Sequence, residues 1–335
     1  MNRLRRKLCL GLAGAALPWC APVLAAGERA KRIYIITFRG RTQVEQGFRA
    51  YLASQGRPLE YIERDLNRDS SRFPALLEEI RRLRPDLVLT WGTTVTEGIV
   101  GRYDAVDPRV HITDIPVLFT LVAAPVSAGL VPSLSASGRN LTGVYHVAST
   151  ESQVRAMGAY RRFRRVGVLY TPTENNSLAI LRELQQIGAS QGFQVEARPF
   201  RLDGAGRPVI DGVARLLGEM KAAGAEWLYL SPDSFLGAHC KEVVIPLAHG
   251  LGLPTFASTE QIMEAGALAG LISRYHSIGQ FTGYKAAQIL FAGQAPSRMP
   301  IETLSRYSFL IRMAVARALH LVPPLAMFDS AEFIE

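Results

Sequence analysis

Gly92, Thr93 and Thr94 directly follow an apolar run at residues 86–90 and precede a helical pattern. Glycine lets the chain turn closely, and the free backbone N–H groups at the start of a helix favour an anion such as a carboxylate. An ordinary strand–turn–helix connection looks the same, with Thr93 or Thr94 as the helix cap. The segment therefore has two interpretations, an anion-binding turn or a plain cap.

Three further polar segments each follow an apolar run and precede a helical pattern. Their candidate ligand-binding residues are Asn175, Ser177, Asp233 and Glu260. An asparagine amide offers donors and acceptors without a charge, and a carboxylate accepts hydrogen bonds from a ligand amine. The alternative is again capping, by Asn176 or Ser177 in the first segment and by the acidic residues in the other two. We favour binding over capping for Asp233 and Glu260.

Residues for catalysis or for a metal are missing from recognisable patterns. The six histidines have no nucleophile-elbow or metal-ligand spacing, and Gly250-x-Gly252 lacks the third glycine of a dinucleotide loop. No phosphate-binding Gly-Lys-Ser or Gly-Lys-Thr sequence is present. We therefore expect a binding protein rather than an enzyme, with no catalytic residue, no metal site and no cofactor.

The first 25 residues have the order of a secretory signal. Met1–Lys7 is basic, Cys9–Leu17 is apolar, and Val23-Leu24-Ala25 is a small-x-small stop. The formal charge of +9 falls to +5 without residues 1–25. We expect export to the periplasm, and Cys20 is a poor lipoprotein candidate because Pro18-Trp19 precedes it. The remaining basic cluster at residues 161–165 has too few aromatic residues for a nucleic-acid site, so we expect no nucleic acid as a partner.

Apolar strand-like runs alternate with helical patterns from residue 32 almost to the end. The predicted strands are 32–38, 86–90, 115–122, 141–145, 165–170, 193–197, 227–230, 254–257 and 268–272. This alternation predicts an α/β fold with two doubly wound, parallel-sheet lobes joined by a hinge, the seam lying near Val147–Glu151. Ligands of such sheets bind at the carboxyl ends of the strands, which places the site in a cleft between the lobes.

Beyond these patterns, Ile115–Gly143 resembles the signature of ABC transporter substrate-binding proteins of the tryptophan/tyrosine type. That signature reads Ile-Pro-(Ile/Val)-Val-Phe, then Asp-Pro-Val, Gly-Leu-Val, Ser-Leu and Gly-Asn-(Val/Ile)-Thr-Gly. Further agreement is found at Gly92-Thr93, in the 170–177 turn and in Leu253–Leu271. The resemblance covers nearly all of the chain after residue 25.

The resemblance implies the type I periplasmic binding protein fold, with three crossovers between the lobes. The first lobe would then hold residues 31–147 and about 277–303, and the second lobe residues 148–276 and about 304–335. The cleft-facing positions that it implies are Gly92, Thr93, Thr94, Asn175, Ser177, Asp233, Glu260 and Tyr275.

Two departures from the family pattern concern the pocket. The family's Gln and His-Pro pair after the first strand is replaced here by Thr37-Phe38-Arg39-Gly40-Arg41, and the Asp of Asp-Pro-Val is Ala124. We hypothesise that Thr37, Arg39 or Arg41 helps to hold an acidic group, because arginine grips a carboxylate with two parallel hydrogen bonds. The alternative is that both arginines are solvated loop residues.

The function that follows is capture of a small polar ligand, an amino acid or related carboxylate, and its delivery to an ABC permease in the inner membrane by a monomer. A periplasmic sensing subunit for a membrane receptor or kinase has the same fold and remains the alternative. An enzyme on a doubly wound fold fits less well. A cytoplasmic repressor domain fits less well too, because no helix-turn-helix precedes residue 32.

Overall fold

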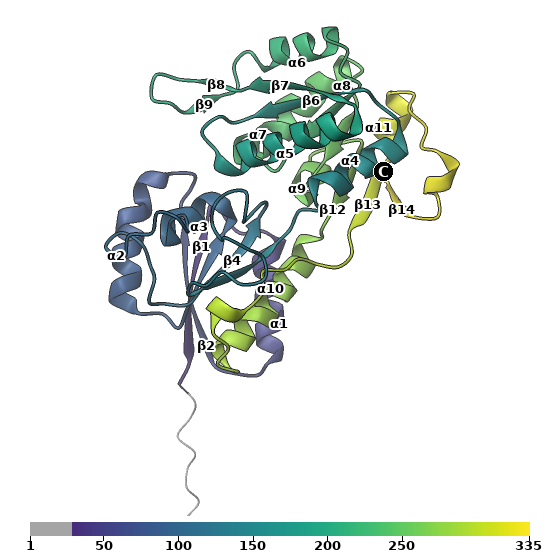
Figure 1. Ribbon diagram of the computed structural model, residues 1–335. Helices are drawn as coiled ribbons and strands as arrows, with labels where there is room; N and C mark the ends of the chain where they lie inside the picture. Colours follow the sequence, from purple (N-terminus) through teal and green to yellow (C-terminus); the bar gives the residue numbers. More distant parts are fainter. Residues whose placement is uncertain (1–28) are drawn as a thin grey trace, which may run out of the picture.

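The computed structural model describes residues 29–335, and the predicted signal at residues 1–25 lies outside this range. Within 29–335, every helix is too short or too polar to cross a membrane. The described chain forms two α/β lobes, the purple-to-blue lobe and the teal-to-green lobe of Figure 1. The predicted α/β fold class with two sheet-based lobes is confirmed.

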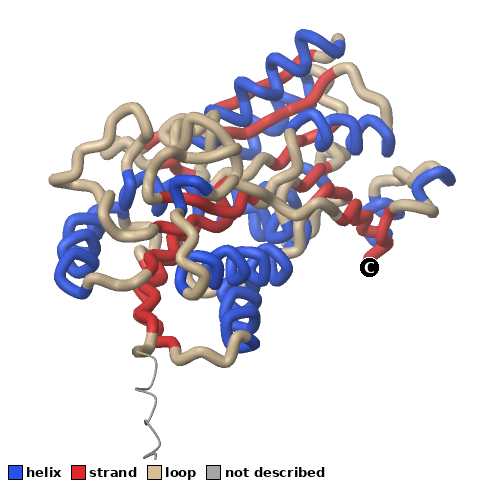
Figure 2. The backbone as a smooth tube through the Cα atoms, turned by 60° about the horizontal axis from the view of Figure 1, so that its bottom comes forward, coloured by secondary structure: helices blue, strands red, loops and turns tan. Residues whose placement is uncertain are grey.

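The first lobe is built on a five-stranded parallel sheet with strand order β2-β1-β3-β4-β5. Its strands are β1 (Lys31–Thr37), β2 (Leu59–Asp65), β3 (Leu87–Trp91), β4 (Val117–Val122) and β5 (Leu141–Tyr145). Its helices in this part of the chain are α1 (Gln43–Ser54), η1 (Ser70–Arg72), α2 (Phe73–Leu83) and α3 (Gly92–Val100). Strands β3 and β4 are buried along their whole length because helices cover both faces of the sheet (Figure 2), which explains their continuous apolar sequences.

The second lobe is built on a seven-stranded sheet with strand order β14-β13-β12-β11-β10-β6-β7. Its strands are β6 (Arg165–Tyr170), β7 (Gln194–Pro199), β10 (Trp227–Leu230), β11 (Thr255–Ala257), β12 (Ala269–Ile272), β13 (Ser308–Arg312) and β14 (Ala331–Ile334), with a small hairpin of β8 (Arg201–Leu202) and β9 (Pro208–Val209) beside them. Its helices are α4 (Thr150–Tyr160), α5 (Asn175–Gln191), α6 (Val213–Ala222), α7 (Ser234–His239), η2 (Cys240–Val244), α8 (Ile245–Gly250), α9 (Glu260–Glu264), α11 (Met313–Ala318) and η4 (Leu325–Met327).

Helix α10 (Tyr275–Leu290) leaves the second sheet and packs along α1 of the first lobe, as Figure 1 shows. The two backbones touch at glycines: a Cβ on Gly279 would lie 2.1 Å from the carbonyl oxygen of Val44, and one on Gly47 would lie 2.1 Å from that of His276. After η3 (Pro296–Arg298) the chain returns to the second sheet as β13.

Three segments connect the lobes, after β5, after β12 and before β13. Two isolated bridges hold them together, from Val147 to Ile272 and from Val144 to Glu302. The residue boundaries that the family resemblance implies for the two lobes stay a prediction.

Two predictions about the sheets need correction. The second sheet is not wholly parallel, because β13 runs antiparallel to β12. Strand β2 was not expected at all: its sequence, LEYIERD, mixes charged and apolar residues, as an edge strand with no fully buried side chain can. Its pattern therefore lacks the continuous apolar run by which the buried strands were recognised.

Candidate functional site

A cavity of about 50 Å³ lies between the lobes, at the carboxyl ends of β1, β3, β4 and β5 of the first sheet and of β6, β10, β11 and β12 of the second. We call it the inner cavity. Its walls are formed by Arg39, Trp91, Gly92, Thr93, Leu121, Ala123, His146, Glu174, Asn176, Pro232, Asp233, Ser234, Gly237, Thr259, Gln261, Ile262 and Tyr275. This is the edge at which ligands of doubly wound sheets bind.

Half of the ten residues predicted from the sequence line the inner cavity. These are Arg39, Gly92, Thr93, Asp233 and Tyr275. The other five lie elsewhere, and they are Thr37, Thr94, Asn175, Ser177 and Glu260. The role of all ten residues as ligand contacts stays a prediction. In the second group, Thr94 belongs to the first turn of α3, and the other four residues have the partners described below.

The turn after β3 places Gly92 and Thr93 in the cavity wall. Helix α3 begins at Gly92 itself, where φ is 79°, a value that favours glycine. Its N-cap is Trp91, which makes no side-chain cap hydrogen bond. The expectation that Thr93 or Thr94 caps the helix is therefore wrong: both belong to its first turn, since the helix starts before them.

Asp233 is the centre of a buried hydrogen-bond network at the base of the second lobe. Its carboxylate accepts from the backbone N–H of Thr171 at 2.8 Å, from the hydroxyl of Thr171 at 3.0 Å and from the hydroxyl of Ser177 at 2.6 Å. It also caps α7 by accepting from the backbone N–H of Leu236 at 2.8 Å. Asp233 is 3% exposed. Asp233 therefore both caps α7 and lines the cavity, and the hydrogen bond from Ser177 orients its carboxylate.

Glu260 is committed to the start of α10 rather than to the inner cavity. Its carboxylate accepts from the backbone N–H of Tyr275 at 2.5 Å and from the guanidinium of Arg274 at 3.3 Å. The cap of its own helix, α9, is Thr259. Glu260 therefore positions Tyr275, whose ring lines the inner cavity and whose pKa is raised to about 12 by burial.

The loop after β1 divides its polar residues between the cavity and the surface. Thr37 donates a hydrogen bond to Asp65 at 3.1 Å, at the end of β2. The side chain of Arg41 is 70% exposed and forms an ion pair with Glu63 at 2.6 Å. Only Arg39 of these three enters the cavity wall, with its guanidinium carbon 5.0 Å from the centroid of the Trp91 ring. Thr37 and Arg41 thus lie outside the cavity wall and are bonded to carboxylates of the protein itself.

Glu174 adds a second carboxylate to the wall opposite Arg39. It accepts from the backbone N–H of Ser234 at 3.0 Å and from the hydroxyl of Ser234 at 2.7 Å. Its pKa is raised above the usual carboxylate range, first because burial disfavours the charged form and second because Asp233 carries a like charge nearby. A cationic group placed between Glu174 and Asp233 would relieve both effects.

Two buried polar atoms in the cavity wall have no hydrogen-bond partner. They are the indole Nε1 of Trp91 and the amide Oδ1 of Asn176. Both residues are more than nine-tenths buried, and they come from opposite lobes. The amide Nδ2 of Asn176 donates to the carbonyl of Pro232 at 2.6 Å, so its Oδ1 is left as a free acceptor. A buried polar group without a partner costs about 1–3 kcal/mol, so a ligand that supplied partners for these two atoms would gain affinity.

His146 closes the cavity on the first-lobe side. Its Nδ1 lies 3.4 Å from the carbonyl of Val122, and its ring meets that of Tyr275 edge-on at 5.8 Å. Burial lowers the pKa of His146 to about 4, so the ring is neutral at physiological pH.

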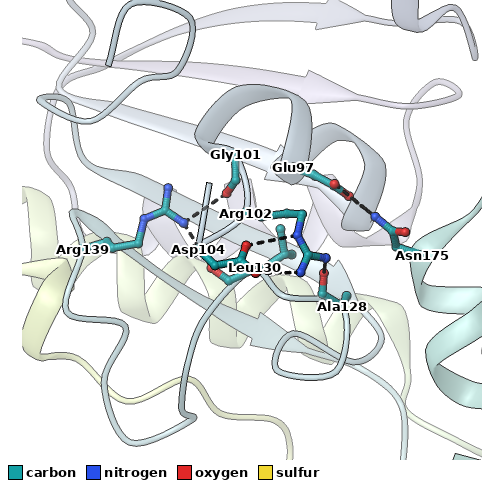
Figure 3. Close-up of polar contacts among 8 residues, drawn as sticks. All are labelled: Glu97, Gly101, Arg102, Asp104, Ala128, Leu130, Arg139 and Asn175. Atoms are coloured by element: carbon teal, nitrogen blue, oxygen red, sulfur yellow. Dashed lines mark hydrogen bonds and ion pairs between the residues drawn. The ribbon is translucent and has the colours of Figure 1, made fainter. Parts of the chain in front are cut away.

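Polar contacts between the lobes show that the cleft is closed. Figure 3 shows Asn175 of α5 donating to the carboxylate of Glu97 on α3, at 2.9 and 3.1 Å. The guanidinium of Arg39 donates to the side-chain oxygen of Gln261 on α9. Asn175 therefore lies at the rim, where it links the lobes instead of lining the cavity.

The loop that follows α3 is fixed by two arginines, also drawn in Figure 3. Arg102 pairs with Asp104 at 3.1 Å and reaches the carbonyl of Ala128, while Arg139 donates to the carbonyls of Gly101 and Leu130, each at 3.1 Å. These contacts hold the end of α3, so that Glu97 meets Asn175 on a rigid support.

Sequence reasoning missed Trp91, His146, Glu174, Asn176 and Gln261. For two of these the error has a clear cause, because helix α5 begins at Asn175, three residues earlier than expected. Successive residues of a helix point about 100° apart, so a different helix start changes which side chains face the cavity. Glu174 and Asn176 line it, whereas we had predicted Asn175 and Ser177. The position of Glu174 and Asn176 after a predicted strand was the one sequence feature that could have indicated them.

The described range contains no group of three or more His, Cys, Asp or Glu residues arranged to hold a metal ion. Cys240 is buried behind α7, and burial raises the pKa of its thiol. Neither feature adds reactive chemistry to the inner cavity.

Comparison with known proteins gives a consistent result. The sequence profile of a family described as "ABC transporter substrate binding protein" matches residues 34–331. A tyrosine-binding protein of Clostridioides difficile (strain R20291) is 26% identical over 207 residues, which are 62% of this chain and 57% of that relative. The match thus spans little more than half of the relative's length.

Solved structures share the fold at low identity. An ABC domain from Streptococcus pneumonia in complex with L-Trp has a TM-score of 0.78 and 21% identity, and covers 92% of this chain and 100% of its own. A conserved domain protein from Vibrio cholerae gives the same values. The ligand-free, open structure of a substrate binding protein with adhesive properties from Clostridium difficile has a TM-score of 0.67 and 21% identity, and covers 91% of this chain and 99% of its own.

Proposed function

The chain belongs to the family of ABC transporter substrate-binding proteins, and we propose that it captures an amino acid or a related carboxylate between its lobes and delivers it to an ABC permease. The relatives support the ligand class, since one is described as a tyrosine-binding protein and another was solved with L-Trp. The protein acts outside the cytoplasmic membrane as a monomer, and it releases its ligand chemically unchanged.

One observation carries this proposal: residues of both lobes line one cavity, and two of them, Trp91 and Asn176, each hold a buried polar atom without a partner. A ligand that touches both lobes makes all of its contacts only when the cleft is closed, so the closed form binds it more tightly than the open form does. Ligand binding therefore shifts the population toward closure.

The charges around the cavity suit a zwitterion. Gly92 and Thr93 present the N-terminus of α3, which favours a carboxylate, and Arg39 adds a positive charge. Glu174 and Asp233 stand together on the second lobe, where they favour an ammonium group. A ligand with both groups bridges the lobes, and the closed protein presents the surfaces of both lobes to the permease.

The test is to identify the solute that the protein carries. Protein purified without a denaturation step is analysed by mass spectrometry for released small molecules, and the compounds found are then tested in a thermal-shift titration. The expected result is a primary amine with a carboxylate that raises the melting temperature, and the rise grows with the logarithm of ligand concentration above the Kd. A protein that carries no such molecule, and whose melting temperature no amino acid raises, would contradict the proposal. Uptake of the labelled compound by cells with and without the protein tests delivery.

A further inference from the structure

Arg39 and Gln261 lie between the inner cavity and a second cavity. The second one, which we call the outer cavity, has a volume of about 290 Å³ and is lined by Arg39, Thr42, Gln43, Glu260, Gln261, Glu264 and Tyr275. Arg39, Gln261 and Tyr275 line both cavities. The side chains of Arg39 and Gln261, which are hydrogen-bonded across the cleft, therefore set the length of the space available to a ligand.

The partition they form is held on both sides. On the first lobe the guanidinium of Arg39 lies over the Trp91 ring, a cation–π arrangement. On the second lobe Gln261 is fixed by donating from Nε2 to the carbonyl of Gly237 at 3.0 Å. Gly237 leaves little spare room, because a Cβ there would lie 3.6 Å from Nη1 of Arg39.

The inner cavity is too small for an aromatic side chain while Arg39 is in place. An engineered apolar cavity of about 150 Å³ takes up benzene, and the inner cavity has only about 50 Å³. A ring would need the space that Arg39 and Trp91 fill. Aspartate itself has more non-hydrogen atoms than benzene, so the lobes must part somewhat to admit any amino acid. An aromatic amino acid would in addition have to displace Arg39 or Trp91 from the space that they fill.

Arg39 also lacks an anionic partner. Among residues 29–335, no carboxylate forms an ion pair with it, and its hydrogen-bond acceptor is the neutral amide of Gln261. Withdrawal from water lowers the pKa of Arg39, and Glu174 in the same cavity wall offsets only part of that effect, without an ion pair. Charges withdrawn from water in proteins are normally paired, so an anion is missing from this part of the cavity.

The geometry points to Arg39 as the residue that determines specificity: it holds the side-chain carboxylate of a short acidic amino acid of the aspartate class, and it excludes aromatic amino acids. Three places in the cavity match three groups of such a ligand. The N-terminus of α3 receives the α-carboxylate, Glu174 and Asp233 receive the ammonium, and Arg39 receives the second carboxylate. The inference rests on the proposed function, because it assigns a ligand to the same cavity.

The experiment measures the affinity of the full mature protein for L-aspartate, L-alanine, L-tyrosine and L-tryptophan by isothermal titration calorimetry, after removal of any carried ligand. The wild-type protein is expected to bind L-aspartate at least tenfold more tightly than the other three. In Arg39→Gln the side chain stays long but loses its charge, so affinity for L-aspartate falls about tenfold or more, the size of one charge-assisted hydrogen bond. L-tyrosine stays excluded in this variant.

Arg39→Ala removes the partition and joins the two cavities, so this variant loses L-aspartate and gains L-tyrosine. The matched control is Arg41→Ala, which removes the same charge two residues away at an exposed position and leaves all four affinities unchanged. Arg39→Gln keeps the test decisive if Arg39→Ala does not fold.

Equal or tighter binding of L-tyrosine or L-tryptophan by the wild-type protein would overturn the inference and leave the proposed function intact. Undiminished affinity of Arg39→Gln for L-aspartate would do the same. A wild-type protein that binds none of the four amino acids and carries no amino acid when purified would overturn the inference and the proposed function together.

Discussion

Replacement of Gly279 by alanine should destabilise the protein because it forces two helix backbones apart. A Cβ at this position of α10 would lie 2.1 Å from the carbonyl oxygen of Val44 and 2.9 Å from the backbone nitrogen of Phe48, both on α1. Ordinary contact begins at 3.4 Å. The atoms it meets belong to the backbone, so no side-chain rotation can make room.

The size of the effect follows from two opposing terms. Overpacking a rigid contact costs about 3 kcal/mol or more, because the two helices must separate by about 1 Å along a tightly packed seam. Alanine is better than glycine in a helix by about 1 kcal/mol, which offsets part of that cost. We therefore expect a loss of about 2–3 kcal/mol in the free energy of unfolding.

The same substitution at Gly218 is the matched control. Gly218 lies within α6, no atom comes within 4 Å of the position of its Cβ, and its φ is ordinary for a helix. Gly218→Ala should therefore stabilise the protein by about 0.5–1 kcal/mol through helix propensity alone.

Urea unfolding followed by circular dichroism measures both variants against the wild-type protein. A Gly279→Ala variant within about 0.5 kcal/mol of Gly218→Ala would refute the reasoning, because α1 and α10 would then have room between them that the structure does not show. Loss of ligand affinity in Gly279→Ala is expected as well, since α10 begins at Tyr275 in the cavity wall.

Three further predictions concern the site. Asp233→Asn should cost about 2–4 kcal/mol, because the amide nitrogen cannot accept the hydrogen bonds that Ser177 and its neighbours donate, and a thermal or urea melt measures this. Its affinity for ligand should fall too, and a variant as stable as the wild type would contradict the described network. His146 has a folded-state pKa of about 4, below its ordinary 6.5, so the stability it contributes is complete above pH 6.5 and is lost as the pH falls toward 4. His146→Asn should therefore lose about 3 kcal/mol less than the wild type between pH 7 and pH 4, and parallel pH profiles of the two proteins would count against a buried neutral ring. Asn175→Ala removes the rim contact with Glu97, so ligand should dissociate about tenfold faster in stopped-flow experiments, while unfolding is little changed; an unchanged dissociation rate would show that this contact does not hold the closed form.

The fold could be predicted from the sequence to the extent that burial shapes the sequence. Strands such as β4 (VLFTLV) are buried on both faces and read as continuous apolar runs. Strand β2 lies at the sheet edge, so its sequence has no continuous apolar run. Strand β13 runs antiparallel to β12 but is as apolar as a parallel strand, so its sequence does not indicate its direction. Direction is decided by tertiary connections, which a local pattern does not contain.

The site was predictable to the level of segments but not of side chains. All four polar segments that follow strands do reach the cavity, since chain order fixes which ends of parallel strands meet. Which residue of a segment faces the cavity depends on where its helix begins, and a shift of one residue rotates a side chain by about 100°. That is why Asn176 lines the cavity and Asn175 meets Glu97 instead.

The residues that were predicted as ligand contacts but lie behind the wall still bear on ligand recognition. Ser177 orients the carboxylate of Asp233, and Glu260 holds the backbone of Tyr275, so each fixes a residue that does line the cavity. Arg39 differs from these residues because it lines the cavity itself. Its one described hydrogen bond to protein, with Gln261, crosses the cleft and exists only when the lobes meet. The guanidinium of Arg39 has five N–H donors, so it can bind a ligand carboxylate and the side-chain oxygen of Gln261 at the same time. Closure and recognition would then be coupled through the same side chain: the anion compensates the charge that closure withdraws from water, and closure brings Gln261 against Arg39 at the end of the space that a ligand side chain can occupy.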